Sequence, residues 1–148
     1  MLKNAVILLV EDDLGDQKLI KSSMFKEKIG NVLKVVGSGE EALQYLQKSK
    51  QGCPQAPMPD LVLLDLNMPG MGGKELLRKI KNDEQLKVIP IVILTTSDSE
   101  QDIFESYKLY ASGYIKKPVT IRGFQQVMQE LEEYWFVVCK PFSGRLFV

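Results

Sequence analysis

The chain has 148 residues, of which 45% are hydrophobic, and its 19 lysines and arginines are balanced by 19 aspartates and glutamates. This length fits one domain that buries roughly 70% of its unfolded surface, and the net charge of zero argues against direct nucleic-acid binding. No apolar run approaches the roughly 20 residues of a membrane span and no signal-peptide pattern is present, so we expect a cytoplasmic protein without membrane contact.

Histidine is absent from the sequence. This excludes histidine-based nucleophilic triads and histidine-type zinc sites, and any phosphohistidine that serves this chain must belong to a partner. Cys53 and Cys139 are far apart and belong to no CxxC pair, so we expect two reduced thiols without a disulfide or a metal.

Apolar strand-like segments alternate with helix-like segments along the chain. We predict strands over residues 5–10, 32–36, 60–65, 89–94 and 113–117. The first, third and fourth are continuously apolar, as expected for central strands covered by helices on both faces. The alternation predicts an α/β fold with a doubly wound, five-stranded parallel sheet of the flavodoxin-like type.

Helix start signals lie between the predicted strands. Ser38 and Ser97 are each followed three residues later by a glutamate, which is the spacing of a capping box. After Thr120, apolar residues recur every three or four positions and predict one buried stripe on the last helix, made of Ile121, Phe124, Met128, Leu131 and Trp135.

Polar side chains follow the apolar strands at the points where the strands end. Asp65 ends the third strand, before a Pro-Gly turn; Glu11 and Asp12 follow the first strand. Thr95 follows the fourth strand and Lys117 ends the fifth. The acidic run, Thr95 and Lys117 are each typical of a turn, a helix cap or a local hydrogen bond, whereas nothing local requires a carboxylate at Asp65. Because ligands bind beyond the carboxyl ends of such strands, their combination predicts a site.

The residue types favour phosphoryl transfer. Glu11, Asp12 and Asp65 would bring three negative charges together, so the cluster either protonates or binds a cation. Oxygen ligands and a phosphate substrate favour Mg²⁺. We predict that Asp65 is the nucleophile that accepts a phosphoryl group. The Lys117 ammonium and the Thr95 hydroxyl would contact the phosphoryl oxygens.

Four motifs together resemble those of the receiver domain of two-component response regulators, over about residues 4–135. They are Leu-Val-Glu-Asp (9–12), Asp-Leu-Asn-Met-Pro-Gly (65–70), Leu-Thr-Thr-Ser (94–97) and Gly-Tyr-Ile-Lys-Lys-Pro (113–118). The resemblance implies the (βα)5 receiver fold and a protein that catalyses only its own aspartyl phosphorylation and dephosphorylation.

The resemblance also implies a role for each matching residue. Asp65 would be the phosphoacceptor. The metal ligands would be Glu11, Asp12, Asp65 and, through its backbone carbonyl, Asn67. Thr95 and Lys117 would contact the phosphoryl group, and Thr95 and Tyr114 would form the conformational switch. Thr96 is bulkier than the small residue that is usual beside the hydroxyl site.

A narrower resemblance is to the single-domain, chemotaxis-regulator-like response regulators of cyanobacterial phytochromes. It rests on the Pro-rich loop 51–59, on Leu-Thr-Thr-Ser and on Glu-Glu-Tyr-Trp-Phe-Val-Val (132–138). It implies a phytochrome, a sensor histidine kinase, as phosphodonor. We expect a receiver domain over residues 1–135 and an apolar C-terminal extension over 136–148, with no output domain. The last helix and this extension would form a homodimer contact.

Two other functions compete with this interpretation. A phosphatase of the haloacid-dehalogenase type also uses an aspartate at a strand end, but it needs a second acid two residues later, where this chain has Asn67. A degenerate receiver that has lost phosphorylation would keep only the fold. All the polar residues expected of an active receiver are present, which disfavours that alternative.

Overall fold

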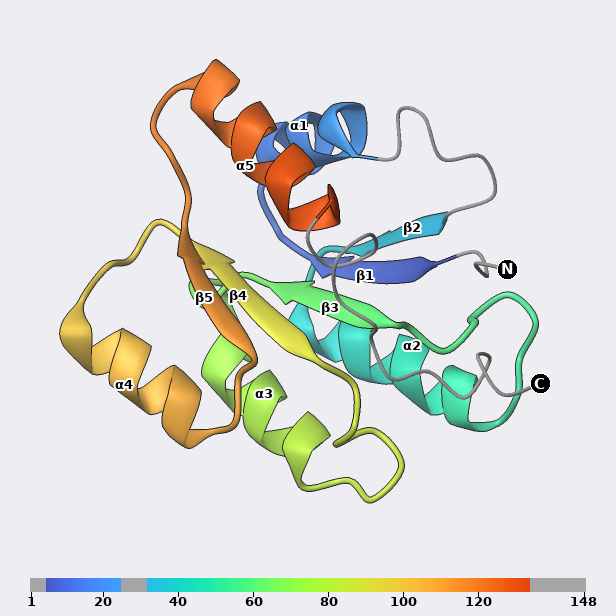
Figure 1. Cartoon of the computed structure of the whole chain (residues 1–148). Helices are drawn as coiled ribbons and strands as arrows, with labels where there is room; N and C mark the ends of the chain where they lie inside the picture. The colour runs from blue at the N-terminus through green and yellow to red at the C-terminus, as the bar shows by residue number, and fades with distance from the viewer. Residues whose placement is uncertain (1–4, 25–31, 134–148) are drawn as a thin grey trace.

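Strands and helices alternate in the computed structural model, which describes residues 5–24 and 32–133 (Figure 1). Their order is β1 (Val6–Val10), α1 (Leu14–Ser23), β2 (Val32–Val36), α2 (Gly39–Lys50), β3 (Leu61–Leu64), α3 (Gly73–Lys81), β4 (Ile91–Thr95), α4 (Glu100–Lys108), β5 (Gly113–Lys116) and α5 (Ile121–Glu133). The strands form one parallel sheet in the order β2-β1-β3-β4-β5. This confirms the predicted doubly wound fold, and the strand order reverses between β1 and β3.

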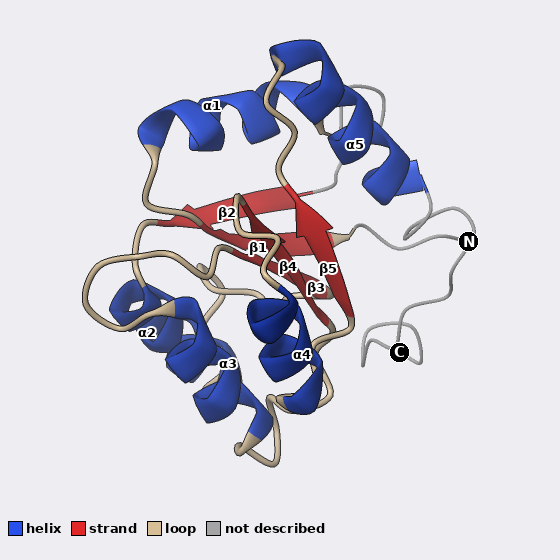
Figure 2. Ribbon diagram, turned by 90° about the vertical axis from the view of Figure 1, so that its left-hand side faces the viewer, coloured by secondary structure: helices blue, strands red, loops and turns tan. Residues whose placement is uncertain are grey.

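The helices cover both faces of the sheet. Figure 2 shows α1 and α5 on one face and α2, α3 and α4 on the other. Alternate residues of β1 serve the two faces: Leu8 and Val10 pack with α2 and α3, whereas Ile7 and Leu9 pack with α1 and α5. All residues of β1, β3 and β4 are buried. This two-sided burial is the physical reason for their continuously apolar sequences.

One of the two predicted helix caps is confirmed and the other is wrong. Ser38 caps α2, where its side chain accepts a hydrogen bond from the Glu41 N–H at 3.1 Å. The cap of α4 is Ser99, not Ser97. The Ser97 hydroxyl instead donates to the Asp102 carboxylate at 2.6 Å, and this contact places Ser97 in the loop before the helix.

The predicted apolar stripe of α5 is correct in its middle and wrong at its start. Phe124, Met128 and Leu131 are buried against the sheet, but Ile121 is 68% exposed. Ile121 is the first residue of the helix, and the buried stripe begins one turn later. Trp135, the extension 136–148 and the homodimer contact expected there lie outside the described residues. Within the described residues, no helix is long and apolar enough to span a membrane.

Candidate functional site

An acidic pocket opens at the carboxyl ends of the central strands. Register places Val10 of β1 beside Leu64 of β3, and the Asp65 N–H donates to the Val10 carbonyl at 3.1 Å, so the acidic residues that follow the two strands are neighbours. The pocket measures about 620 Å³ and is lined by residues 11–16, Asp65, Asn67, Thr96 and Lys117. Six water molecules occupy roughly 180 Å³ at liquid density, so a hydrated cation and a phosphoryl group both fit.

Three carboxylates form a cluster in this pocket. One oxygen from each of Glu11, Asp12 and Asp65 lies within 4.8 Å of the others. Two ligands on opposite sides of a magnesium ion are roughly 4 Å apart, because each bond is about 2.1 Å long. The cluster therefore matches the donor type and spacing of a small divalent cation. Glu11 and Asp65 are buried, whereas Asp12 is exposed to solvent.

Lys117 supplies the positive charge of the pocket. Its side chain is 5% exposed, and its ammonium donates to Glu11 Oε1 and, at 2.8 Å, to Asp16 Oδ2. The ammonium also lies 3.5 Å from Asp65 Oδ2. Burial lowers the pKa of Lys117, but the hydrogen bonds to Asp16 and Glu11 outweigh burial and raise the pKa above its ordinary value. Lys117 is therefore a stable cation at neutral pH.

The buried Glu11 side chain is harder to ionise than a glutamate in water. Burial raises the pKa of Glu11 from 4.5 to about 7, although the hydrogen bond and the charge of Lys117 both lower it. The neighbouring Asp65 carboxylate raises it further. A cation bound between these carboxylates would oppose both effects that raise this pKa.

Binding of a divalent cation to this cluster is expected to weaken about tenfold for each pH unit below the Glu11 pKa of about 7, and to change little above it. Below this pH, a proton must leave Glu11 before its carboxylate can bind the ion. Calorimetric titration with Mg²⁺ at pH 6 and at pH 8 measures the difference. In the Glu11→Gln control the titrating group is gone, so weaker but equal affinities are expected at both pH values. Equal affinities in the unchanged protein would contradict the prediction.

Asn67 connects the pocket to Thr95. Its backbone N–H donates to Asp65 Oδ1 at 3.2 Å, and its side-chain amide donates to Thr95 Oγ1 at 3.2 Å. Thr95 is the last residue of β4 and is buried. The Thr95 hydroxyl is thus joined to the pocket through Asn67, and because it accepts in this bond, its own proton can still be donated to an acceptor.

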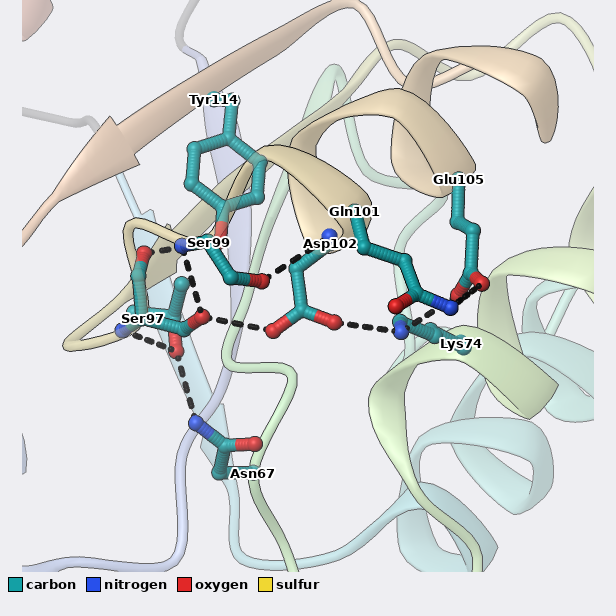
Figure 3. A network of polar contacts seen from close by, with 9 residues as sticks. Asn67, Lys74, Ser97, Ser99, Gln101, Asp102, Glu105 and Tyr114 are labelled. Atoms are coloured by element: carbon teal, nitrogen blue, oxygen red, sulfur yellow. Dashed lines mark hydrogen bonds and ion pairs between the residues drawn. The ribbon is translucent and has the colours of Figure 1, made fainter.

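A polar network leads from Thr95 towards α3 and α4 (Figure 3). The Ser97 N–H lies 3.5 Å from Thr95 Oγ1, and the Ser97 hydroxyl donates to Asp102. Lys74 of α3 then forms ion pairs with Asp102 at 2.5 Å and with Glu105 at 2.6 Å. Among the residues of α4, only Ser106 is buried, and these partly exposed ion pairs join α4 to α3.

Tyr114 lies outside the pocket, at the far side of this network. Its hydroxyl donates to the Ser97 carbonyl at 2.8 Å, as Figure 3 shows. Burial raises the pKa of Tyr114, so the phenol stays protonated and keeps its donor. The structure therefore brings the predicted acids, Asn67 and Lys117 into one pocket. Thr95 is joined to this pocket through Asn67, and Tyr114 is joined to Thr95 through Ser97 in the loop after β4.

Sequence reasoning missed two residues that shape the pocket. Asp16 of α1 holds the Lys117 ammonium; its only sequence signal is an acidic residue in the first turn of the helix that follows the acidic pair. Gly73 begins α3 directly against the backbone of Asp65, where an added Cβ would lie 2.4 Å from the Asp65 carbonyl oxygen. The Asp-Leu-Asn-Met-Pro-Gly motif ends before Gly73 and carries no signal for it.

Comparisons with known proteins agree with this geometry. The sequence matches the response regulator receiver domain family over residues 7–129. It is 37% identical over 130 residues to response regulator Rcp1 from Synechocystis sp., covering 88% of each chain. The crystal structure of the phosphorylated cyanobacterial phytochrome response regulator RcpA is similar, with a TM-score of 0.89 and 38% identity over 95% of this chain and 100% of that chain.

A second similar structure is the Mn²⁺-bound form of response regulator Rcp1, with a TM-score of 0.86 and 34% identity over 94% of this chain and 99% of that chain. The expected family and its function as a response regulator are confirmed. The chain belongs to the response regulator receiver domain family and is a homologue of the cyanobacterial phytochrome response regulators.

Proposed function

We propose that Asp65 accepts a phosphoryl group from a phosphohistidine of a partner sensor kinase. The observation that carries this proposal is the buried Asp65 carboxylate, which shares one pocket with the acidic pair and with the Lys117 ammonium 3.5 Å away. A carboxylate oxygen of Asp65 attacks phosphorus and forms the new O–P bond. The P–N bond of the donor breaks, and its electron pair leaves with the imidazole.

The surrounding side chains stabilise charge and set geometry. A bound Mg²⁺, held by Glu11, Asp12, Asp65 and the backbone carbonyl of Asn67, would offset the repulsion between Asp65 and the incoming group. Lys117 presents a permanent positive charge to one phosphoryl oxygen. Thr95 presents its hydroxyl proton to another. Asn67 supplies no carboxylate to protonate a leaving alcohol, which disfavours turnover of foreign phosphoesters.

The signal would leave through the surface of this receiver domain. When Thr95 turns its hydroxyl towards the phosphoryl group, its bonds to Asn67 and to the Ser97 N–H change. Ser97 holds both Tyr114 and Asp102, so the change reaches β5 and α4 through one loop. Tyr114 and the weakly packed α4 are then the elements that would present a different face to a target.

We infer a phytochrome as the partner kinase, because phytochrome response regulators are among the similar proteins. The proposal includes Mg²⁺ as the cation, a cytoplasmic location and no direct contact with nucleic acid. The protein would catalyse only its own phosphorylation and dephosphorylation.

Asp65→Asn is expected to abolish a phosphoryl adduct that the unchanged protein forms with Mg²⁺ and acetyl phosphate. The amide cannot act as the nucleophile but keeps the size of the side chain. Intact-mass spectrometry measures an adduct that is acid-stable and base-labile. Asp13→Asn is the matched control: it removes an acidic residue from the same pocket, and asparagine still caps α1.

Each competing function predicts a different result from this experiment. Sustained multiple turnover of unrelated phosphoesters would support a phosphatase. No adduct with acetyl phosphate or with a phosphorylated sensor kinase would support a binding module that has lost phosphorylation. An adduct that persists in Asp65→Asn would place the phosphoacceptor elsewhere.

A further inference from the structure

Lys117 is shared among three carboxylates, and the phosphoacceptor is the most distant of them. The ammonium donates hydrogen bonds to Glu11 and to Asp16, but its distance of 3.5 Å from Asp65 Oδ2 is longer than a good hydrogen bond. An ammonium has three N–H donors. Before phosphorylation, the Lys117 ammonium, which would contact a phosphoryl oxygen on Asp65, is therefore held by Glu11 and Asp16.

The backbone of Asp16 is held in place by its own helix. It lies in the first turn of α1, where its backbone N–H donates to Asp13 Oδ1 at 2.8 Å. One turn later, Ile20 is fully buried against the sheet and anchors the helix. The Asp16 carboxylate is thus presented to Lys117 from a stable support, with 31% of its side chain exposed.

The three carboxylates respond differently when the site is loaded. Glu11 and Asp65 belong to the cluster that suits a cation, but Asp16 does not. A cation at this cluster would draw Glu11 away from the Lys117 ammonium. The hydrogen bond to Asp16 would then be the one that still holds the ammonium. A phosphoryl group on Asp65 carries about −1.5 to −2 charges and would draw the Lys117 ammonium towards it, and the hydrogen bond to Asp16 would resist that movement.

We propose that Asp16 is a positioning residue that holds Lys117 on the α1 side of the pocket and thereby restrains phosphorylation of Asp65. The inference rests on the proposed role of Asp65 as phosphoacceptor. Asp16, in the first turn of α1, would thus control the rate of phosphorylation through Lys117, without itself contacting the phosphoryl group.

Asp16→Asn is expected to form the phosphoryl adduct roughly threefold to tenfold faster than the unchanged protein, because a charge-assisted hydrogen bond to Lys117 is weakened. The initial rate is measured by intact mass with acetyl phosphate, at Mg²⁺ concentrations that no longer limit the rate of each variant. Asp13→Asn is the control, because Asp13 is an acid of the same helix start and is not among the carboxylates that pair with Lys117.

Asp16→Glu tests whether the charge is the cause, since it keeps the carboxylate and should restore a rate near that of the unchanged protein. A merely structural role of Asp16 would not produce this pattern. The inference is overturned if Asp16→Asn is slower than Asp13→Asn or within twofold of it, or if Asp16→Glu is as fast as Asp16→Asn. Absence of an adduct in the unchanged protein would instead overturn the proposed function itself.

Discussion

Lys117→Met is expected to lower the free energy of unfolding by about 3–5 kcal/mol at pH 8, the cost of leaving a buried charge without its partner. Methionine keeps most of the aliphatic side chain but removes the ammonium from Glu11, whose side chain is 1% exposed. Urea unfolding, followed by circular dichroism at pH 5 and at pH 8, measures the loss.

The sign of the pH dependence follows from Glu11. Its pKa is raised from 4.5 to about 7, so folding takes up a proton between these pH values. Its contribution to stability is therefore complete below pH 4.5 and is lost as the pH rises through about 7. Without Lys117 the pKa of Glu11 rises further, because the hydrogen bond and the charge of Lys117 no longer lower it. The loss in Lys117→Met should consequently be smaller at pH 5 than at pH 8.

The double variant Lys117→Met with Glu11→Gln provides the control for this explanation. A neutral amide at position 11 removes the unpaired charge, so the double variant should be more stable than Lys117→Met at pH 8. The two variants should differ little at pH 5. An equal loss of stability in Lys117→Met at both pH values would show that the buried carboxylate is not the cause.

Gly73→Ala is expected to lower the free energy of unfolding by about 1–3 kcal/mol and to slow adduct formation on Asp65 by roughly tenfold or more. The added Cβ would lie 2.4 Å from the Asp65 carbonyl oxygen and 2.7 Å from Leu66 Cα. Both atoms belong to the backbone, so the segment that carries the phosphoacceptor must shift. Urea unfolding and the initial rate with acetyl phosphate measure the two effects.

Gly37→Ala is the matched control for Gly73→Ala. At position 37 the nearest atom to an added Cβ is the Gln17 side-chain nitrogen at 4.0 Å, and the glycine φ is not positive. Stability and adduct formation should therefore stay close to those of the unchanged protein. A rate in Gly73→Ala equal to that of Gly37→Ala would show that the loop after β3 tolerates the shift.

Much of the fold follows from local sequence because burial on two sides leaves a clear pattern. The continuously apolar strands are correct for this reason. The Ser38 cap is correct because it depends on a local contact, between residues three positions apart. The sequence leaves two candidates for the cap of α4, because Ser97 and Ser99 both have an acidic residue three positions later. Only the loop geometry decides that Ser97 bonds the Asp102 side chain, while Ser99 accepts from the Asp102 backbone N–H.

The sequence by itself determined the parallel sheet and the residues that follow its strands, including Asp65 and its acidic neighbours. The carboxyl ends of parallel strands lie at the same edge of a sheet, so the strand pattern alone predicts one pocket there. The tertiary structure alone decided which carboxylates form ion pairs with Lys117. Asp16 is 101 residues away from Lys117 in the chain, and the close approach of Gly73 to Asp65 depends on how α3 packs. Such contacts arise from strand order and helix packing, which leave no periodic trace in the sequence.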